Sequence, residues 1–299
     1  MTEEIKEINV GSIILSPGFD EFNPESEKLS KYNYTTLISQ YGYSRYPNVV
    51  TSIEFERILS ASGPYEGHLL RPSDMQEPKK IAWIQCVGSR DVTCNSGYCS
   101  SVCCMYAIKE AVIAKEHSTV FLDVSIFYMD MRTYGKDFDK YYERAKEEHG
   151  IRFVRSKVRN IEEIDETGTL SIRYSPETGG ISREEFDIVV LSVGLKPKSG
   201  AIEMADRIGL DLNQYDFCET GTFTPVNTSR DGIYVCGAFQ GPKDISETVM
   251  QASGAAAASA ALLSEARGEL VKEKEFPPQA DVVGEPPRIG VFVCHCGIN

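Results

Sequence analysis

Five of the nine cysteines in this chain of 299 residues fall within nineteen consecutive positions, from Cys86 to Cys104. The segment reads CVGSRDVTCNSGYCSSVCC, and it lies in a long acidic chain rather than in a small secreted one. Small secreted domains use dense cysteines as a disulfide framework, whereas the same density in a large chain more often binds a soft metal. The segment therefore predicts a metal centre built on thiolates.

The residues around this segment predict where the thiols lie in the fold. Lys79–Gln85 is an apolar run typical of a strand, and Ser100–Lys115 has the spacing of a helix. The cysteines thus occupy the first strand-to-helix turn, where a dinucleotide-binding domain carries GxGxxG. Only Gly88 and Gly97 occur here, so we expect sulfur ligands in place of a pyrophosphate cradle, and negligible use of nicotinamide. The positive helix end would favour an anionic cluster.

Spacing selects four of the five thiols as ligands of a [4Fe-4S] cluster. Cys99 and Cys103 are one helical turn apart, and Cys104 follows directly. Cys86 ends the preceding strand and can close the site from the opposite side, which leaves Cys94 as the spare thiol. Two alternatives stay open, a zinc site and buried or redox-active cysteines without metal, although zinc ligands usually come as paired Cys-X-X-Cys.

The rest of the chain predicts an α/β fold from alternating strands and helices. The expected elements are a buried strand over Ile8–Leu15, a strand over Ser118–Tyr128, a helix over Asp137–Gly150, a hairpin around Pro176–Gly180, a strand over Gly232–Cys236 and a helix over Ser246–Arg267. This order is typical of a nucleotide-binding domain. The isolated Cys218 and Cys236 are predicted as packed core thiols.

Composition excludes several classes of function. The chain has 31 Lys plus Arg against 44 Asp plus Glu, and its net charge of -13 disfavours nucleic acid or anionic lipid as a partner. No run reaches the roughly 18 apolar residues of a membrane span, and the start MTEEIKEINV lacks the regions of a signal peptide. We therefore expect a cytoplasmic protein with reduced thiols.

Two lysines are candidates for contacts with a redox cofactor. Lys109 lies on the helix that leaves the cysteines and could direct a cation toward a reduced flavin or the cluster. Lys243, in the turn GPKD before the last helix, could meet a phosphate or an isoalloxazine carbonyl. The alternatives are a solvated helix lysine and a turn lysine.

Three stretches, CVGSRD, CSSVCCMYAIKEA and GIYVCGAFQGPKDISETVMQASGAAA, together resemble the flavin and iron-sulfur subunit of the heterodisulfide reductase family over about residues 8–270. The resemblance implies a fold like that of thioredoxin reductase, in which an FAD-binding domain is interrupted by a second Rossmann-like domain that here carries the iron-sulfur cluster. The expected division is a first FAD segment over 1–70, the cluster domain over 71–185, a returning FAD segment over 186–270, and a linker with the start of a further module over 271–299.

The resemblance also implies site residues. Cys86, Cys99, Cys103 and Cys104 become the cluster ligands, and Lys109 lies near the flavin ring as the catalytic candidate. The residues expected to contact FAD are Pro17, Gly18, Gly194, Gly237, Ala238, Lys243, Asp244 and Ile245.

The implied function is electron transfer between FAD, the cluster and partners, with a flavin that splits electron pairs. The expected partners are other subunits of a heterodisulfide-reductase-type complex and a ferredoxin or hydrogenase-type donor. The first FAD fingerprint, GxGxxG, is missing, and the ending RIGVFVCHCGIN, with Cys294 and Cys296, resembles the opening of another copy, which favours a fused or truncated form.

Two other classes of function remain. One is a dithiol oxidoreductase like thioredoxin reductase, in which Cys103 and Cys104, or Cys94 and Cys99, cycle as a disulfide. The other is a scaffold that docks redox subunits and holds no cofactor.

Overall fold

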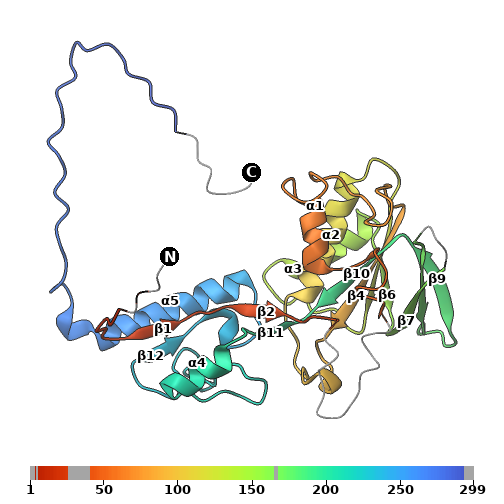
Figure 1. Cartoon of the computed structure of the whole chain (residues 1–299), viewed down its shortest axis with the longest axis horizontal. Coiled ribbons are helices and arrows are strands. Elements are labelled where there is room, and N and C mark those ends of the chain that lie inside the picture. The colour runs from red at the N-terminus through yellow and green to blue at the C-terminus, as the bar shows by residue number, and fades with distance from the viewer. Residues whose placement is uncertain (1–3, 5, 26–40, 165–167, 293–299) are drawn as a thin grey trace.

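The larger part of the molecule is a five-stranded parallel sheet with the strand order β3-β10-β4-β5-β6 (Figure 1). The structure is a computed structural model and describes residues 4, 6–25, 41–164 and 168–292. The strands are β3 (Val49–Thr51), β10 (Ile188–Val193), β4 (Lys80–Val87), β5 (Asp123–Tyr128) and β6 (Arg152–Arg155). Strands β4 and β10 are almost continuously apolar because both faces of a parallel sheet are covered.

Helices cover one face of this sheet and a small antiparallel sheet covers the other. The helices are α1 (Ser52–Leu59), α2 (Cys103–His117) and α3 (Phe138–Glu147). The antiparallel strands are β7 (Val158–Glu163), β8 (Leu170–Tyr174) and β9 (Ser182–Phe186). Under the helices, Phe55 meets Trp83 edge to face with ring centroids 5.1 Å apart. The three layers confirm the predicted α/β class and the hairpin between β8 and β9.

The smaller part of the molecule combines a strand from the beginning of the chain with strands and helices from its last third. Strand β1 (Ile13–Leu15) pairs in parallel with β12 (Ile233–Val235), and the helices α4 (Ala201–Ile208) and α5 (Ile245–Leu262) lie beside them. Strands β2 (Phe19–Glu21) and β11 (Leu195–Pro197) form an antiparallel ribbon between the two parts (Figure 1). Short 3₁₀ turns are η2 (Val92–Cys94), η3 (Gly237–Phe239) and η4 (Ser264–Ala266).

The predicted strand over Ile8–Leu15 is wrong in extent and in burial. Only Ile13–Leu15 is a strand, while the side chains of Ile8 and Val10 are 77% and 61% exposed. The reason is that β1 pairs with a single strand, β12, within the described residues, so little covers it. The strand predicted over Ser118–Tyr128 is also shorter and starts at Asp123.

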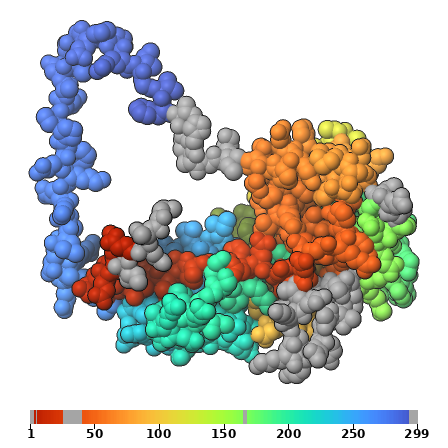
Figure 2. Space-filling view, in the orientation of Figure 1, coloured from red at the N-terminus to blue at the C-terminus, as the bar shows by residue number. Residues whose placement is uncertain are grey.

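The central sheet draws strands from three of the expected segments. Strand β3 comes from residues 1–70, β4 to β6 come from 71–185, and β10 comes from 186–270. The pairing of β10 between β3 and β4 makes these strands one structural unit, although the division of the chain into cofactor-binding domains stays a prediction. Residues 267–292 form no helix or strand and stand clear of the rest (Figure 2).

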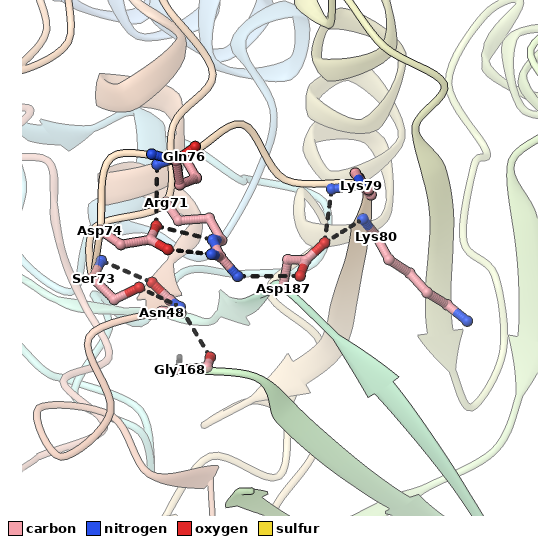
Figure 3. A network of polar contacts seen from close by, with 9 residues as sticks. All are labelled: Asn48, Arg71, Ser73, Asp74, Gln76, Lys79, Lys80, Gly168 and Asp187. Carbon is pink, nitrogen blue, oxygen red and sulfur yellow. Dashed lines mark hydrogen bonds and ion pairs between the residues drawn. The ribbon is translucent and has the colours of Figure 1, made fainter. Parts of the chain in front are cut away.

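A polar network fixes the amino-terminal edge of the central sheet (Figure 3). The carboxylate of Asp187, just before β10, accepts hydrogen bonds from the backbone N–H groups of Lys79 at 2.7 Å and Lys80 at 2.9 Å. It also pairs with Arg71 at 3.3 Å, and Arg71 pairs in turn with Asp74. The network holds the starts of β4 and β10 together, so the carboxyl ends of both strands meet at the opposite edge, where the cysteine segment begins.

Within these described ranges, no helix combines the length and the apolar character needed to cross a bilayer.

Candidate functional site

The cysteine segment leaves the carboxyl end of β4 and folds back on itself before α2. Cys86 has a φ of +63°, a left-handed conformation that distorts β4 one residue before its end, where the pairing with β10 shifts register. The N–H of Arg90 donates to the carbonyl oxygen of Tyr98 at 2.8 Å, and the hydroxyl of Ser89 donates to the same oxygen at 3.1 Å. The N–H of Ser100 then donates to Ser89 Oγ at 3.0 Å. The chain between the first and the later cysteines is therefore a closed loop.

This loop brings four of the five cysteine side chains close enough to influence one another. Burial, followed by the neighbouring thiols of Cys104 and Cys99, raises the pKa of Cys86 to about 11. Burial also raises the pKa of Cys103, with further contributions from Cys86, Cys104 and Cys99. A lone thiolate is thus disfavoured here unless a metal or another cation shares the site.

Backbone donors point at two of the four sulfur atoms. The N–H of Ser101 lies 3.4 Å from Cys99 Sγ, and the N–H of Arg132 lies 3.4 Å from Cys104 Sγ. Hydrogen bonds of this kind to the sulfur ligands are one of the levers that set the potential of an iron-sulfur cluster.

Two guanidinium groups lie at the edge of the thiol group. Arg90 lowers the pKa of Cys86 against the effect of burial, and Arg132 interacts with the thiol of Cys99. Both arginines pair with the carboxylate of Asp130. Positive charge therefore lies beside Cys86, Cys99 and Cys104, partly balanced by the Asp130 carboxylate, and this suits an anionic group.

Cys94 lies apart from the other four. Its side chain is 3% exposed and packs in the core between the central sheet and the antiparallel sheet. Burial raises its pKa, and the charges that act on it are Asp91, Lys196 and Lys157 rather than the other cysteines. All seven cysteines in the described part of the chain are free thiols. Cys218 and Cys236 are buried, which confirms their prediction as core residues, whereas Cys294 and Cys296 lie outside the described residues.

No three His, Cys, Asp or Glu side chains converge as a site for one metal ion among the residues described. The zinc alternative therefore gains no support from the geometry. Ligands of a four-iron cluster are spread around several metal atoms, so they need not meet this condition.

A cavity of about 980 Å³ lies against the other side of the α2 N-terminus. Four residues expected to contact the flavin line it, namely Lys109 from α2 and Lys243, Asp244 and Ile245 from the start of α5. The remaining walls come from α1, α2, α3, β2, β10 and β11 and are rich in aromatic and aliphatic side chains. An apolar cavity with a few charged groups is the usual form of a cofactor site.

The two candidate lysines behave differently in this cavity. Lys109 is exposed and lines the cavity wall. The ammonium of Lys243 instead donates to the carbonyl oxygens of Gly237 at 2.9 Å and Gly241 at 2.8 Å, and to Gln240 Oε1 at 2.8 Å. A contact between Lys243 and a ligand would therefore require one of these bonds to be exchanged.

The start of α5 is fixed by a capping box. The Asp244 carboxylate accepts the N–H of Glu247 at 2.7 Å, and the Glu247 carboxylate accepts the N–H of Asp244 at 3.0 Å. Asp244 thus has a structural role, and the exposed Ile245 is the first residue of the helix. The N-terminus of this 18-residue helix opens onto the cavity.

The remaining predicted flavin residues lie in the turns near the cavity rather than in its walls. Gly18 has a φ of +83° and Gly237 one of +73°, so both turns need the left-handed conformation that glycine tolerates. Pro17 precedes the first turn, and Ala238 lies in η3 after the second. At Gly194 a Cβ atom would lie 2.8 Å from the carbonyl oxygen of Gly88. Gly194 therefore permits close packing of the cysteine loop on β10.

Tyr106 connects the thiols with the cavity, although it is not among the residues predicted from the sequence. Its side chain lines the cavity, and its hydroxyl donates to the carbonyl oxygen of Val193 at 2.7 Å. The thiol of Cys103 donates to the same oxygen at 3.6 Å. The signal in the sequence is the spacing of three, which places Cys103 and Tyr106 on one side of α2.

The segment after β10 positions the cysteine loop. The hydroxyl of Tyr98 donates to the carbonyl oxygen of Leu195 at 2.8 Å, and its ring meets Tyr215 edge to face with centroids 4.8 Å apart. The ammonium of Lys196 donates to the carbonyl oxygen of Cys94 at 3.1 Å. These contacts tie the loop to the β2–β11 ribbon and hence to the smaller part of the molecule.

This architecture matches that of a known protein family. The model of the pyridine nucleotide-disulphide oxidoreductases matches residues 10–259. The chain belongs to the pyridine nucleotide-disulphide oxidoreductase family. Thioredoxin reductase of Lactococcus lactis, a structure with 18% sequence identity, superposes with a TM-score of 0.50 and covers 87% of this chain and 67% of its own. The predicted α/β fold like that of thioredoxin reductase is thus confirmed, whereas the iron-sulfur cluster in its second domain stays a prediction.

Within this family, the chain is similar to subunits of heterodisulfide reductases. The CoB--CoM heterodisulfide reductase iron-sulfur subunit of Methanocaldococcus jannaschii is 43% identical over 259 residues, covering 86% of this chain and 37% of the relative. The corresponding subunit of the H(2):CoB-CoM heterodisulfide,ferredoxin reductase of Methanothermobacter marburgensis is also 43% identical, covering 86% and 38%. The resemblance found in the sequence is confirmed, and the chain spans well under half of the length of these relatives.

Proposed function

We propose that this chain is an electron-transfer module of an oxidoreductase that holds one [4Fe-4S] cluster and a flavin. Cys86, Cys99, Cys103 and Cys104 would bind the cluster, which would take up and release single electrons. The observation that carries the proposal is the grouping of these four thiols around α2, with Cys94 packed elsewhere.

The residues present fit an iron-sulfur cluster. Four sulfur atoms come from one loop and the helix that follows, two of them accept backbone N–H groups, and two guanidinium groups lie beside them. A cluster with four thiolates is an anion, so the nearby positive charges and the N-terminus of α2 would stabilise it. The name iron-sulfur subunit of the Methanocaldococcus jannaschii relative agrees with this fit.

The cavity beside α2 is the proposed place of the flavin. FAD would supply the two-electron chemistry when bound, while this chain would provide the apolar walls, the Lys109 cation and the N-terminus of α5. Val193 and Tyr106 line this cavity, and the carbonyl oxygen of Val193 accepts hydrogen bonds from both Tyr106 and Cys103. The two proposed cofactors would therefore be neighbours.

The finer parts of the proposal concern partners and electron flow. We propose that the chain works in a complex of the heterodisulfide reductase type, in the cytoplasm, and exchanges electrons with other subunits and with a ferredoxin or hydrogenase-type donor. The names of the relatives, which mention ferredoxin and H(2), support this assignment. Division of electron pairs at the flavin is part of the same proposal, as is the assignment of residues 71–185 to a cluster domain within an FAD domain.

Measurement of iron, acid-labile sulfide and flavin on one anaerobic preparation tests the proposal. The full chain is reconstituted with iron, sulfide and FAD, and the bound amounts per chain are then determined after desalting. About four iron and four sulfide per chain are expected for one [4Fe-4S] cluster. Zinc, or a Cys103–Cys104 or Cys94–Cys99 disulfide without iron, would replace the proposal by one of its two alternatives.

A further inference from the structure

Two buried polar side chains at the end of the central sheet have no hydrogen-bond partner in the part of the chain that the structure describes. They are Gln85, with both amide atoms unpaired, and Ser192, with its hydroxyl unpaired. The exposed fractions of these side chains are 8% and 0%. Buried polar groups are nearly always paired, so each unpaired one needs an explanation.

Strand geometry places both side chains on the face of the sheet that the helices cover. Successive residues of a strand point to opposite faces. Trp83 and Val190 belong to the core under the helices, whereas Ile84 and Leu191 belong to the core on the opposite face. Gln85 follows Ile84 and Ser192 follows Leu191, so both point toward the helices.

The pairing of β4 with β10 brings the two residues next to each other and to the thiols. Leu191 is opposite Ile84, and after a register shift Val193 is opposite Val87. Ser192 therefore lies opposite the Gln85–Cys86 stretch. Gln85 directly precedes Cys86, and Ser192 directly precedes Val193, whose carbonyl oxygen accepts the Cys103 thiol.

We infer that Gln85 and Ser192 donate hydrogen bonds to the sulfur atoms of the iron-sulfur centre and so raise its reduction potential. This inference rests on the proposed function. The Gln85 amide has two N–H donors and the Ser192 hydroxyl has one. Reduction adds negative charge to the cluster, and donors to sulfur stabilise the reduced form more than the oxidised form. A cluster at this place would give these donors the acceptors that the described residues do not provide.

Variants that remove the donors without changing the thiols test the inference. Gln85→Leu and Ser192→Ala are reconstituted as full chains beside the wild type. The control is Ser125→Ala. Ser125 is also 0% exposed, but its hydroxyl oxygen accepts a hydrogen bond from the Arg152 guanidinium at 2.8 Å. Iron and sulfide content, the midpoint potential followed by electron paramagnetic resonance, and urea unfolding of the metal-free chain are measured for each.

The expected result separates the two roles of a buried polar group. Gln85→Leu and Ser192→Ala keep iron and sulfide, shift the midpoint potential to lower values, and unfold at the wild-type urea concentration or higher when metal-free. Ser125→Ala unfolds at a lower urea concentration and keeps the wild-type potential.

Three results would speak against the inference in distinguishable ways. Variant clusters with the wild-type potential would overturn it and leave the proposed function intact. Destabilised metal-free variants would also overturn it, because the side chains would then hold an internal partner such as a water molecule. A wild-type chain that binds no iron would remove the proposed function itself. If the Gln85 variant does not fold, Ser192→Ala decides alone.

Discussion

Cys103 and Tyr106 share one acceptor, because the carbonyl oxygen of Val193 lies 3.6 Å from the thiol and 2.7 Å from the hydroxyl. A single peptide group at the end of β10 therefore contacts both the thiol group and a wall of the large cavity. The shared acceptor thus connects the start of α2 with the end of β10.

Tyr106→Phe is expected to lower the free energy of unfolding by about 1 kcal/mol, since the variant loses one partly buried hydrogen bond and keeps the aromatic ring. Urea unfolding of the metal-free chain measures the change. Tyr134→Phe is the control, because the Tyr134 side chain is 61% exposed and its change is expected to stay within about 0.5 kcal/mol. Equal effects of the two substitutions would show that the bond to Val193 contributes nothing.

Single cysteine substitutions are expected to divide the five thiols into ligands and a bystander. Cys99→Ala and Cys103→Ala should lose most of the iron and sulfide after anaerobic reconstitution, because each removes one of the four proposed cluster ligands. Cys94→Ala keeps both, because Cys94 packs in another core. Iron and sulfide assays together with the broad visible absorbance give the measurement. Loss of iron from the Cys94 variant with retention in the Cys103 variant would reverse the assignment.

Glu110 is expected to make stability fall with rising pH. Burial raises its pKa well above the ordinary 4.5, and Trp83 Nε1 donates to its carboxyl group at 2.8 Å. A raised pKa in the folded state means that the contribution to stability is complete below about pH 4.5 and is lost as the pH rises toward the folded-state pKa.

Glu110→Gln removes this loss, because an amide does not titrate. Between about pH 5 and about pH 8, the free energy of unfolding of the variant should fall less than that of the wild type. The matched control is Glu116→Gln, an exposed position on the same helix that should keep the wild-type slope. Urea unfolding at several pH values gives the slopes, and identical slopes for all three proteins would contradict the assignment.

Asp187→Asn is expected to lower the free energy of unfolding by about 2 kcal/mol. The carboxylate accepts two backbone N–H groups and pairs with Arg71, and hydrogen bonds to charged groups contribute more than neutral ones (Figure 3). Asp137→Asn, which removes an exposed pair with Lys140, should change stability by less than about 0.5 kcal/mol. Urea unfolding measures both changes. A loss in the Asp187 variant no larger than that in the Asp137 control would show that the network is dispensable.

The sequence predicted strands β4 and β5 of the central sheet and helix α2, because their apolar runs and helical spacing are local signals. It overestimated the strand at Ile8–Leu15, since burial depends on how many neighbours a strand acquires, and β1 pairs only with β12 in the described chain. The place of β10 between β3 and β4 depends on pairing across more than a hundred residues, which no local pattern reports.

The residues of the candidate site also fall into those that the local sequence predicts and those that depend on contacts between distant segments. Spacing predicted Cys99, Cys103 and Cys104 as one group and left Cys94 as the spare thiol, because residues in a short loop and in the first turn of the next helix lie close together. The contact of Tyr106 with Val193 depends on how α2 packs on β10, and the place of Gln85 beside Ser192 depends on the register between β4 and β10. The three internal hydrogen bonds of Lys243 depend on the fold of a turn, so its residue type alone could not reveal them.

Helix α2 begins with Cys103 and Cys104 and carries Tyr106 and Lys109 in its first two turns. An α-helix rises about 1.5 Å per residue and keeps this spacing as long as its backbone hydrogen bonds hold. Under the proposed function, this helix would therefore keep the cluster thiols at a fixed distance from the wall that Tyr106 and Lys109 give to the flavin cavity. Electron transfer between the cluster and a flavin held against this wall would then need no movement of the helix that carries the thiols.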